Sequence, residues 1–403
     1  MKKAIQKYIN NYKGFSKEIW ILTLVTFINR AGTMVLPFLS KYLREDLAFT
    51  LPQVGWIMVS FGMGSMAGSW LGGKLSDKIG FYKIMVFSLA ATGVLFFFMQ
   101  YVTSFYGLLF AMFLIMAIAD MFRPAMFVSI GAYAKEENRT RALTLVRLAV
   151  NLGFAAGPAL GGLIIMGMGY QGLFWVDGAS CLISITIFAL LVKEKKKSKF
   201  NKEEIIPNAN ASVFKDKIFW LFLVTSLISG ILFFQLFTTL PIYHADQFKL
   251  TEFQTGLLLT FNGGLIFLLE MPIVSYIEKH KISRPKIILL GAFLMAVSFF
   301  FLEYTGSAII LIVMMLFMTL GEMLIFPFAN TFALSRAPKG HEGRYMAIFT
   351  MSYSLAHILS AKTGFTIIDL TSYNVNWLFM GGLGLVGTLF AYRVYQLTEK
   401  EKI

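Results

Sequence analysis

Ionisable side chains inside otherwise apolar stretches are the residues of this sequence best suited to chemistry. A lone charge in hydrocarbon is costly, so each such group is expected to face a protein interior, a cavity or a partner. A carboxylate in a dehydrated cavity can bind a proton at one face of a membrane and release it at the other. The proton-coupling candidates are Asp120, Glu270, Glu322 and His357. For His357, proton transfer and a hydrogen-bonded packing role are both open.

A second group of embedded residues is suited to contacting a transported molecule. The substrate-cavity candidates are Asn29, Arg30, Arg147, Asn151, Phe233 and Gln235. Phe233 belongs to an aromatic-rich stretch that suits apolar cargo, although such residues also face lipid or fill cores. For Asp120, Arg123 and Arg147 the alternative is a static ion network that closes one side of the protein. Lys362, near the end of its stretch, can snorkel to the interface.

Composition and apolar runs indicate the fold that must position these residues. The 403 residues are 57% hydrophobic and only 14% charged, too little charge to cover a water-facing surface. Apolar stretches of spanning length number twelve and cover 19–43, 52–72, 84–102, 105–130, 143–166, 172–192, 218–243, 253–277, 285–303, 307–334, 345–369 and 374–397. The sequence therefore predicts an all-α polytopic membrane protein with twelve transmembrane helices.

The basic residues are distributed unevenly between the two sides of this arrangement. Of the 36 Lys and Arg, 29 fall in the termini and in the loops on the same side, and three fall in the opposite loops. By the positive-inside rule, we expect both termini on the cytoplasmic side of a cell (plasma or inner) membrane. The net charge of +14 is thus a topology signal with some attraction to lipid headgroups, and we expect no nucleic-acid partner.

A polar segment and an internal repeat divide the chain. Residues 193–217 are predicted to be a cytoplasmic linker between an N-terminal six-helix bundle (1–192) and a C-terminal one (218–403). The stretch from Pro124 aligns with the stretch from Pro327, and Arg141 then falls on Arg344 without a gap. The two halves are therefore expected to be pseudo-repeats.

The charged segment Gly73–Lys83, GKLSDKIGFYK, lies between two apolar runs and is predicted to be a tight turn. Its pattern resembles the loop between helices 2 and 3 of the major facilitator superfamily of secondary transporters. The resemblance implies the major facilitator fold, with the substrate site between two six-helix halves. It also implies that Asp77, with Gly73 and Gly80, forms a conformational gate whose candidate partners are Arg123 and Arg141.

Residues 153–162, GFAAGPALGG, contain glycines spaced by four and a proline. Such glycines allow close helix packing in membranes, and Pro158 is expected to kink the span. The pattern Gly153, Gly157, Pro158, Gly161 and Gly162 resembles the helix 5 signature of the drug:proton antiporters in that superfamily. Antiporters of this branch usually carry an arginine in helix 4 where Phe113 stands here, so their proton relay does not transfer directly.

The favoured function is proton-coupled export of small amphiphilic molecules or drugs by alternating access, that is, multidrug efflux by an antiporter. The alternative is a proton-coupled symporter that imports peptides or another small nutrient. We expect no enzyme activity, cofactor or metal site, because zinc and phosphate-loop motifs are absent from the sequence. The single Cys181 excludes an intramolecular disulfide. The expected partners are a small-molecule substrate, protons and the lipid bilayer, with the chain acting as a monomer.

Overall fold

The computed structural model describes residues 14–134, 139–195, 213–304, 306–337 and 342–401. Most of the predicted linker 193–217 lies outside these residues. The helices of the described part are α2 (Lys17–Ala31), α3 (Val35–Glu45), α4 (Leu51–Ile79), α5 (Phe81–Met99), α6 (Phe105–Ala119), α7 (Phe122–Tyr133), α8 (Arg139–Met168), α9 (Gln171–Leu191), α10 (Lys217–Phe234), α11 (Thr239–Phe248), α12 (Glu252–Lys279), α13 (Arg284–Phe300), α14 (Ile309–Arg336), α15 (Glu342–Leu370) and α16 (Tyr373–Lys400). No strand occurs in this part of the chain, which confirms the all-α prediction.

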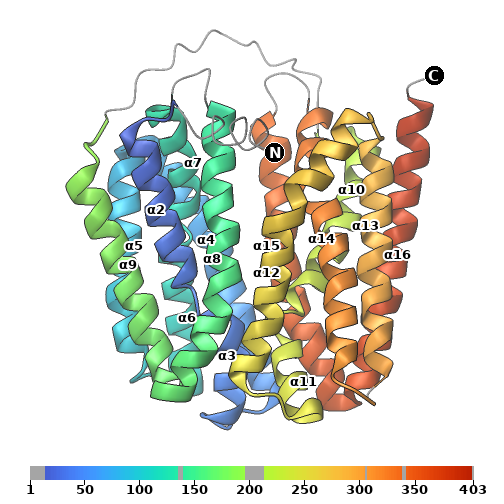
Figure 1. Cartoon of the computed structure of the whole chain (residues 1–403), viewed down its shortest axis with the longest axis horizontal. Coiled ribbons are helices and arrows are strands. Elements are labelled where there is room, and N and C mark those ends of the chain that lie inside the picture. The colour runs from blue at the N-terminus through green and yellow to red at the C-terminus, as the bar shows by residue number, and fades with distance from the viewer. Residues whose placement is uncertain (1–13, 135–138, 196–212, 305, 338–341, 402–403) are drawn as a thin grey trace, which may run out of the picture. The chain divides into compact units, whose positions relative to one another are not determined.

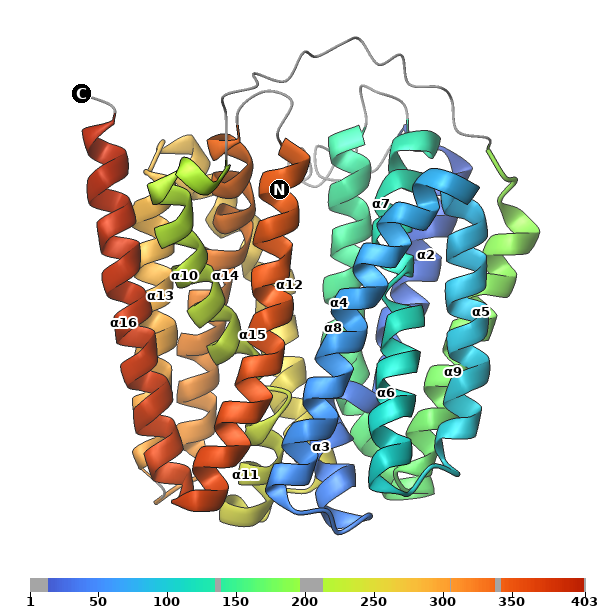
Figure 2. The same cartoon turned by 180° about the vertical axis from the view of Figure 1, so that it is seen from behind.

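All twelve predicted stretches are helical (Figures 1 and 2). In the described residues, ten segments are long and apolar enough to cross a membrane; three of them join consecutive helices, namely α2 with α3, α6 with α7, and α10 with α11. The other two predicted spans correspond to α4 and α15, each 29 residues long. The chain therefore has the helices of a multi-pass membrane protein.

The helices group into two compact units by their contacts. One unit comprises residues 1–36 and 63–200, and the other comprises 37–62 and 201–403. In the first, α2 packs on α8 and α9, and α5 packs on α9. In the second, α13 packs on α14 and α16, and α10 packs on α15 and α16. The predicted boundary at 193–217 stays a prediction.

Three spans are interrupted within their apolar stretch, and each interruption precedes a proline. Pro37, Pro124 and Pro241 are the third residues of α3, α7 and α11. Proline lacks the N–H that a continuous helix would donate to the carbonyl four residues earlier, and its ring clashes with that carbonyl. Proline is tolerated in the first turn of a new helix, where those N–H groups have no helical partner. The three prolines therefore suit the first turns of the helices that follow the breaks, whereas α8, α12 and α14 continue through Pro158, Pro272 and Pro327.

The segment Gly73–Lys83 differs from the predicted turn. α4 continues through Ile79 and α5 begins at Phe81, so Gly80 is the only residue of the segment outside a helix. Gly80 has φ +98°, a backbone conformation that side chains with a Cβ rarely adopt. The polar residues that we expected in a loop thus form the last turns of α4, because Lys, Leu, Ser and Asp are all compatible with a helix and only Gly80 ends it.

Candidate functional site

The end of α2 carries Asn29 and Arg30, two of the predicted substrate-contacting residues. The Asn29 amide donates to the Cys181 Sγ at 3.5 Å and is largely buried. The Arg30 guanidinium lies over the Phe154 ring, 5.6 Å from its centroid. Arg30 also interacts electrostatically with Asp120 and Arg123. Asn29 and Arg30 therefore lie beside the break in the first span, with Asp120 and Arg123 near enough to act on the Arg30 charge.

The predicted glycine motif on α8 is what brings α8 close to Arg30. A Cβ added to Gly153 would lie 2.6 Å from the Arg30 Cβ and 2.8 Å from the Ala31 backbone nitrogen. A Cβ on Gly157 would lie 3.2 Å from the Ala31 carbonyl oxygen. Pro158, Gly161 and Gly162 are also buried, and α8 continues as a helix through Pro158. The motif is therefore a close-packing surface for the last turn of α2.

Asp120 lies at the break between α6 and α7, and the Ser65 hydroxyl of α4 donates to its carboxylate. Arg123 is exposed in the first turn of α7, and Arg147 and Asn151 lie one helical turn apart on α8. A Cβ on Gly72 would lie 2.5 Å from the Met121 Cα, so the end of α4 is packed against the start of α7. The side chains of Asp77 and Arg141 lie outside what the structure describes, and the predicted gate stays a prediction.

Glu322 is the more enclosed of the two predicted proton-coupling carboxylates in the second unit. Its side chain is 9% exposed near the middle of α14, and it accepts a hydrogen bond of 3.0 Å from the Asn262 amide of α12. The same amide donates to the Thr319 hydroxyl at 2.9 Å, one turn before Glu322. Glu270 lies two turns beyond Asn262 on α12 and is partly exposed. A buried carboxylate thus sits against a side-chain amide.

Gln235, another predicted substrate-contacting residue, is fully buried at the end of α10. Its amide donates to the Ser360 carbonyl at 3.0 Å and hydroxyl at 2.8 Å, and its oxygen accepts from Thr239. These bonds join α10 and α11 to α15 across the break in span seven. The amide of Gln235 is therefore engaged by the protein itself.

His357 lies one turn before Ser360 on α15. Its ring packs 5.1 Å from the Phe61 ring and 4.5 Å from the Phe234 ring, between centroids. Phe233, next along α10, packs instead against Phe234, Phe237 and Phe326. The surroundings of His357 are aromatic, which suits the packing alternative as well as a role in proton transfer.

Sequence reasoning missed two polar residues that the fold makes prominent. Asp177 is 2% exposed on α9, and its carboxylate accepts from the backbone N–H groups of Met34 and Val35. A lone carboxylate in an apolar span is a signal that the sequence did carry. Asn262 had no such signal, because an asparagine in a span gains meaning only from its proximity to Glu322.

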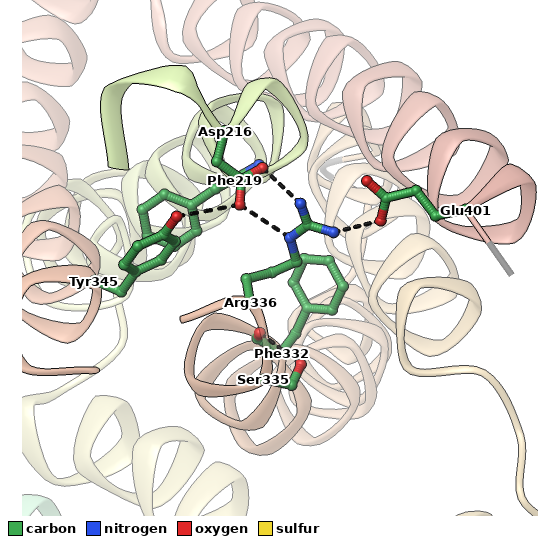
Figure 3. A network of polar contacts seen from close by, with 7 residues as sticks. All are labelled: Asp216, Phe219, Phe332, Ser335, Arg336, Tyr345 and Glu401. Carbon is green, nitrogen blue, oxygen red and sulfur yellow. Dashed lines mark hydrogen bonds and ion pairs between the residues drawn. The ribbon is translucent and has the colours of Figure 1, made fainter. Parts of the chain in front are cut away.

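The ends of the second unit's helices are joined by a charged network (Figure 3), here called the second-half cluster: Asp216, Arg336 and Glu401. The Arg336 guanidinium donates to both Asp216 carboxylate oxygens, at 3.0 and 2.8 Å, and also to Glu401. Asp216 caps α10 by accepting from the Phe219 N–H, and the Tyr345 hydroxyl donates to it at 3.4 Å. One guanidinium thus connects the start of α10, the end of α14 and the end of α16.

The first unit has a counterpart, the first-half cluster: Ser16, Tyr133 and Lys193. Ser16, the cap of α2, donates to the Tyr133 carbonyl at 3.1 Å, and the Tyr133 hydroxyl donates to the Lys193 carbonyl at 2.9 Å. Tyr133 and Arg336 each lie nine residues after the prolines that align in the sequence repeat, Pro124 and Pro327. Both clusters therefore connect the same three helix ends of their halves, one with neutral groups and one with charges.

Comparisons with known proteins agree with this architecture. A family model described as the Major Facilitator Superfamily matches residues 20–361. The Na(+), Li(+), K(+)/H(+) antiporter of Planococcus maritimus is 21% identical over 411 residues, covering 94% of this chain and 95% of that protein. Quinolone resistance protein NorA of Staphylococcus aureus (strain MSSA476) is 27% identical over 258 residues, covering 62% of this chain and 64% of that protein.

Solved structures share the fold at low sequence identity. The crystal structure of a POT family transporter in complex with 5-aminolevulinic acid superposes with a TM-score of 0.78 and 17% identity, covering 93% of this chain and 96% of that chain. At this identity the likeness concerns the fold.

The second-half cluster generates a prediction about stability. Arg336→Met leaves the Asp216 and Glu401 carboxylates without their shared donor, so we expect the free energy of unfolding to fall by about 1.5–3 kcal/mol. Tyr133→Phe, which removes one neutral hydrogen bond of the first-half cluster, should cost about 0.5–1.5 kcal/mol. The measurement is unfolding of the purified protein in detergent. Arg393→Met is the matched control, since Arg393 is exposed and, within the described part of the chain, its hydrogen bond goes to Gln396 three residues on. Equal losses in Arg336→Met and the control would contradict the prediction.

The α8 motif generates a second prediction. Gly153→Ala places a methyl group against the backbone of α2, and overpacking of this kind destabilises by about 1–3 kcal/mol. Gly167→Ala on the same helix is the control, because nothing lies within 4 Å of an added Cβ there. Thermal unfolding and transport assays of both variants would measure the difference. Normal stability and transport in Gly153→Ala would show that α8 and α2 do not need this close approach.

Proposed function

Because the chain belongs to the Major Facilitator Superfamily, we propose that it is a proton-coupled antiporter that exports small amphiphilic molecules or drugs by alternating access. One relative is named as a cation/proton antiporter, and another as a quinolone resistance protein. The glycine motif of α8, whose pattern resembles that of drug:proton antiporters, also supports export. The proposed setting is a cell membrane with both termini in the cytoplasm, as the distribution of basic residues favours.

The observation that carries the proposal is the environment of Glu322. A buried carboxylate in a span is costly unless it is used or paired. Among the residues that the structure describes, the hydrogen-bond partner of Glu322 is the amide of Asn262 rather than a cation. An amide can remain hydrogen-bonded to the carboxyl group in either protonation state by changing which of its atoms it presents. Proton binding and release at Glu322 is therefore compatible with its surroundings, and we assign it the coupling role, with Asp120, Glu270 and His357 as further candidates.

We also propose that the end of α4 acts as a conformational gate. Gly73, Asp77 and Gly80 belong to this segment, and the packing of Gly72 against Met121 supports a contact between the end of α4 and the start of α7. Arg123 lies two residues after Met121 and is exposed, so it is a candidate partner for Asp77, as is Arg141.

Glu322→Gln tests the coupling role. The amide is isosteric but cannot titrate, so transport driven by an imposed pH gradient in proteoliposomes should fall to the level of protein-free vesicles. Substrate exchange without a pH gradient should persist, which shows that the variant is folded. Glu194→Gln, at an exposed position after α9, is the control. Undiminished proton-driven extrusion in Glu322→Gln would remove Glu322 from the mechanism, and proton-driven uptake of a peptide by the unmodified protein would favour the symporter alternative.

Asp77→Asn tests the gate. Loss of the charge weakens any ion pair with Arg123 or Arg141, so we expect a lower maximal transport rate with an unchanged range of substrates. Rates for several dyes in the same vesicles would measure both quantities. A changed substrate range would contradict a purely conformational role for this segment.

A further inference from the structure

The first span is built from two helices whose junction is held from a neighbouring helix. α2 ends at Ala31 and α3 begins at Val35, with Pro37 in the first turn of α3, where its missing N–H costs no helical bond. The Met34 N–H donates to the Asp177 Oδ1 at 2.9 Å, and the Val35 N–H donates to the Oδ2 at 3.1 Å. Each carboxylate oxygen of Asp177 therefore holds one of the N–H groups at the start of α3.

This contact answers a specific requirement of the membrane interior. The first N–H groups of a helix have no partner within it, and in a bilayer water is not available to satisfy them. A carboxylate at a helix N-terminus also interacts favourably with the helix dipole. Asp177, on α9, supplies both the hydrogen bonds and the favourable charge. Ser180, one turn further along α9, occupies the space that a side chain at position 32 would need, so glycine is required there.

The far end of α3 is held by a different contact. Lys41 is 2% exposed, and its ammonium group lies 2.6 Å from the Glu252 carboxylate at the start of α12 and 3.7 Å from that of Glu45. The chain passes from the first contact unit to the second at residues 36 and 37. The two N–H groups bound by Asp177 therefore lie just before the point where the first span passes from one contact unit to the other.

We propose that Asp177 is a positioning residue for transport: it fixes the pivot at residues 32–34 about which α3 changes its angle to α2 during the cycle. The proposal rests on the alternating access put forward above. Asp177 touches neither substrate nor proton in this role. It keeps the backbone at the junction bonded while α3, attached at its other end through Lys41, moves.

Asp177→Asn tests the role at constant size. Its amide oxygen can accept one N–H, but its NH2 group opposes the other donor. The expected result is a maximal transport rate about tenfold lower, equivalent to about 1.4 kcal/mol in the barrier, with the substrate KM within about twofold. Asp369→Asn, at an exposed position near the end of α15, is the matched control.

A second substitution separates positioning from simple misfolding. Val35→Pro removes the N–H that the NH2 group would oppose, and proline is favoured at the first position of a helix. The double variant Asp177→Asn with Val35→Pro should therefore regain most of the lost rate. A purely structural role predicts that Asp177→Asn lowers yield and thermal stability while the rate per folded molecule stays normal, and that result would overturn the proposal.

A spectroscopic measurement tests the pivot without relying on transport. Cys181 is the only cysteine, so Cys181→Ser gives a background for spin labels introduced by Trp20→Cys on α2 and Asp46→Cys just after α3, both exposed positions. In nanodiscs the distance between the labels should shift with pH or added dye, and Asp177→Asn should broaden its distribution and abolish the shift. A distribution that Asp177→Asn leaves unchanged would overturn the proposal, even if the exported molecule proves to be of another class.

Discussion

The constraint on which the rest of this structure depends is that every backbone polar group in the membrane interior needs a partner. Three spans are interrupted just before Pro37, Pro124 and Pro241, and each interruption releases backbone groups that a continuous helix would have paired. Polar side chains stand at all three breaks: Asp177 binds the N–H groups before Pro37, Asp120 lies directly before α7, and Gln235 joins the broken span to α15. Each break therefore has a polar side chain beside it in an otherwise apolar span.

The two halves use one plan with different chemistry. Spans one and seven, the first spans of the two halves, are each broken before a proline, and the clusters around Tyr133 and Arg336 connect corresponding helix ends. The first-half cluster uses a hydroxyl and backbone carbonyls, whereas the second uses a guanidinium between two carboxylates. A repeat that preserves the position of a contact but not its chemistry shows that the fold requires the connection itself, while the groups that make it can change.

The sequence predicted the helices and the α8 packing motif, because spanning length and glycine spacing are local properties. It also singled out Glu322, since a carboxylate in an apolar run is costly wherever it lies. It did not predict that the segment 73–79 is helical, because charge alone does not end a helix. The bond from Asn262 to Glu322 and the bonds from Gln235 to Ser360 join residues more than 50 positions apart, and no local pattern contains them. The prolines at the breaks are visible in the sequence, but the sequence did not show where the helices that contain them begin.

Two buried carboxylates, Asp177 and Glu322, differ in the kind of hydrogen-bond donor that binds them, and this difference bears on the role of each. Asp177 is bound by backbone N–H groups, which cannot turn away. Its departure would remove the Val35 N–H bond and leave the Met34 N–H with its bond to the Gly32 carbonyl, in a medium that offers no water. Glu322 is bound by a side-chain amide, which can rotate and also bonds Thr319. A group that must exchange its proton benefits from a partner that can adjust, and a group that must hold the backbone benefits from one that cannot. This difference, more than burial, is why we place proton coupling at Glu322 and the pivot at Asp177.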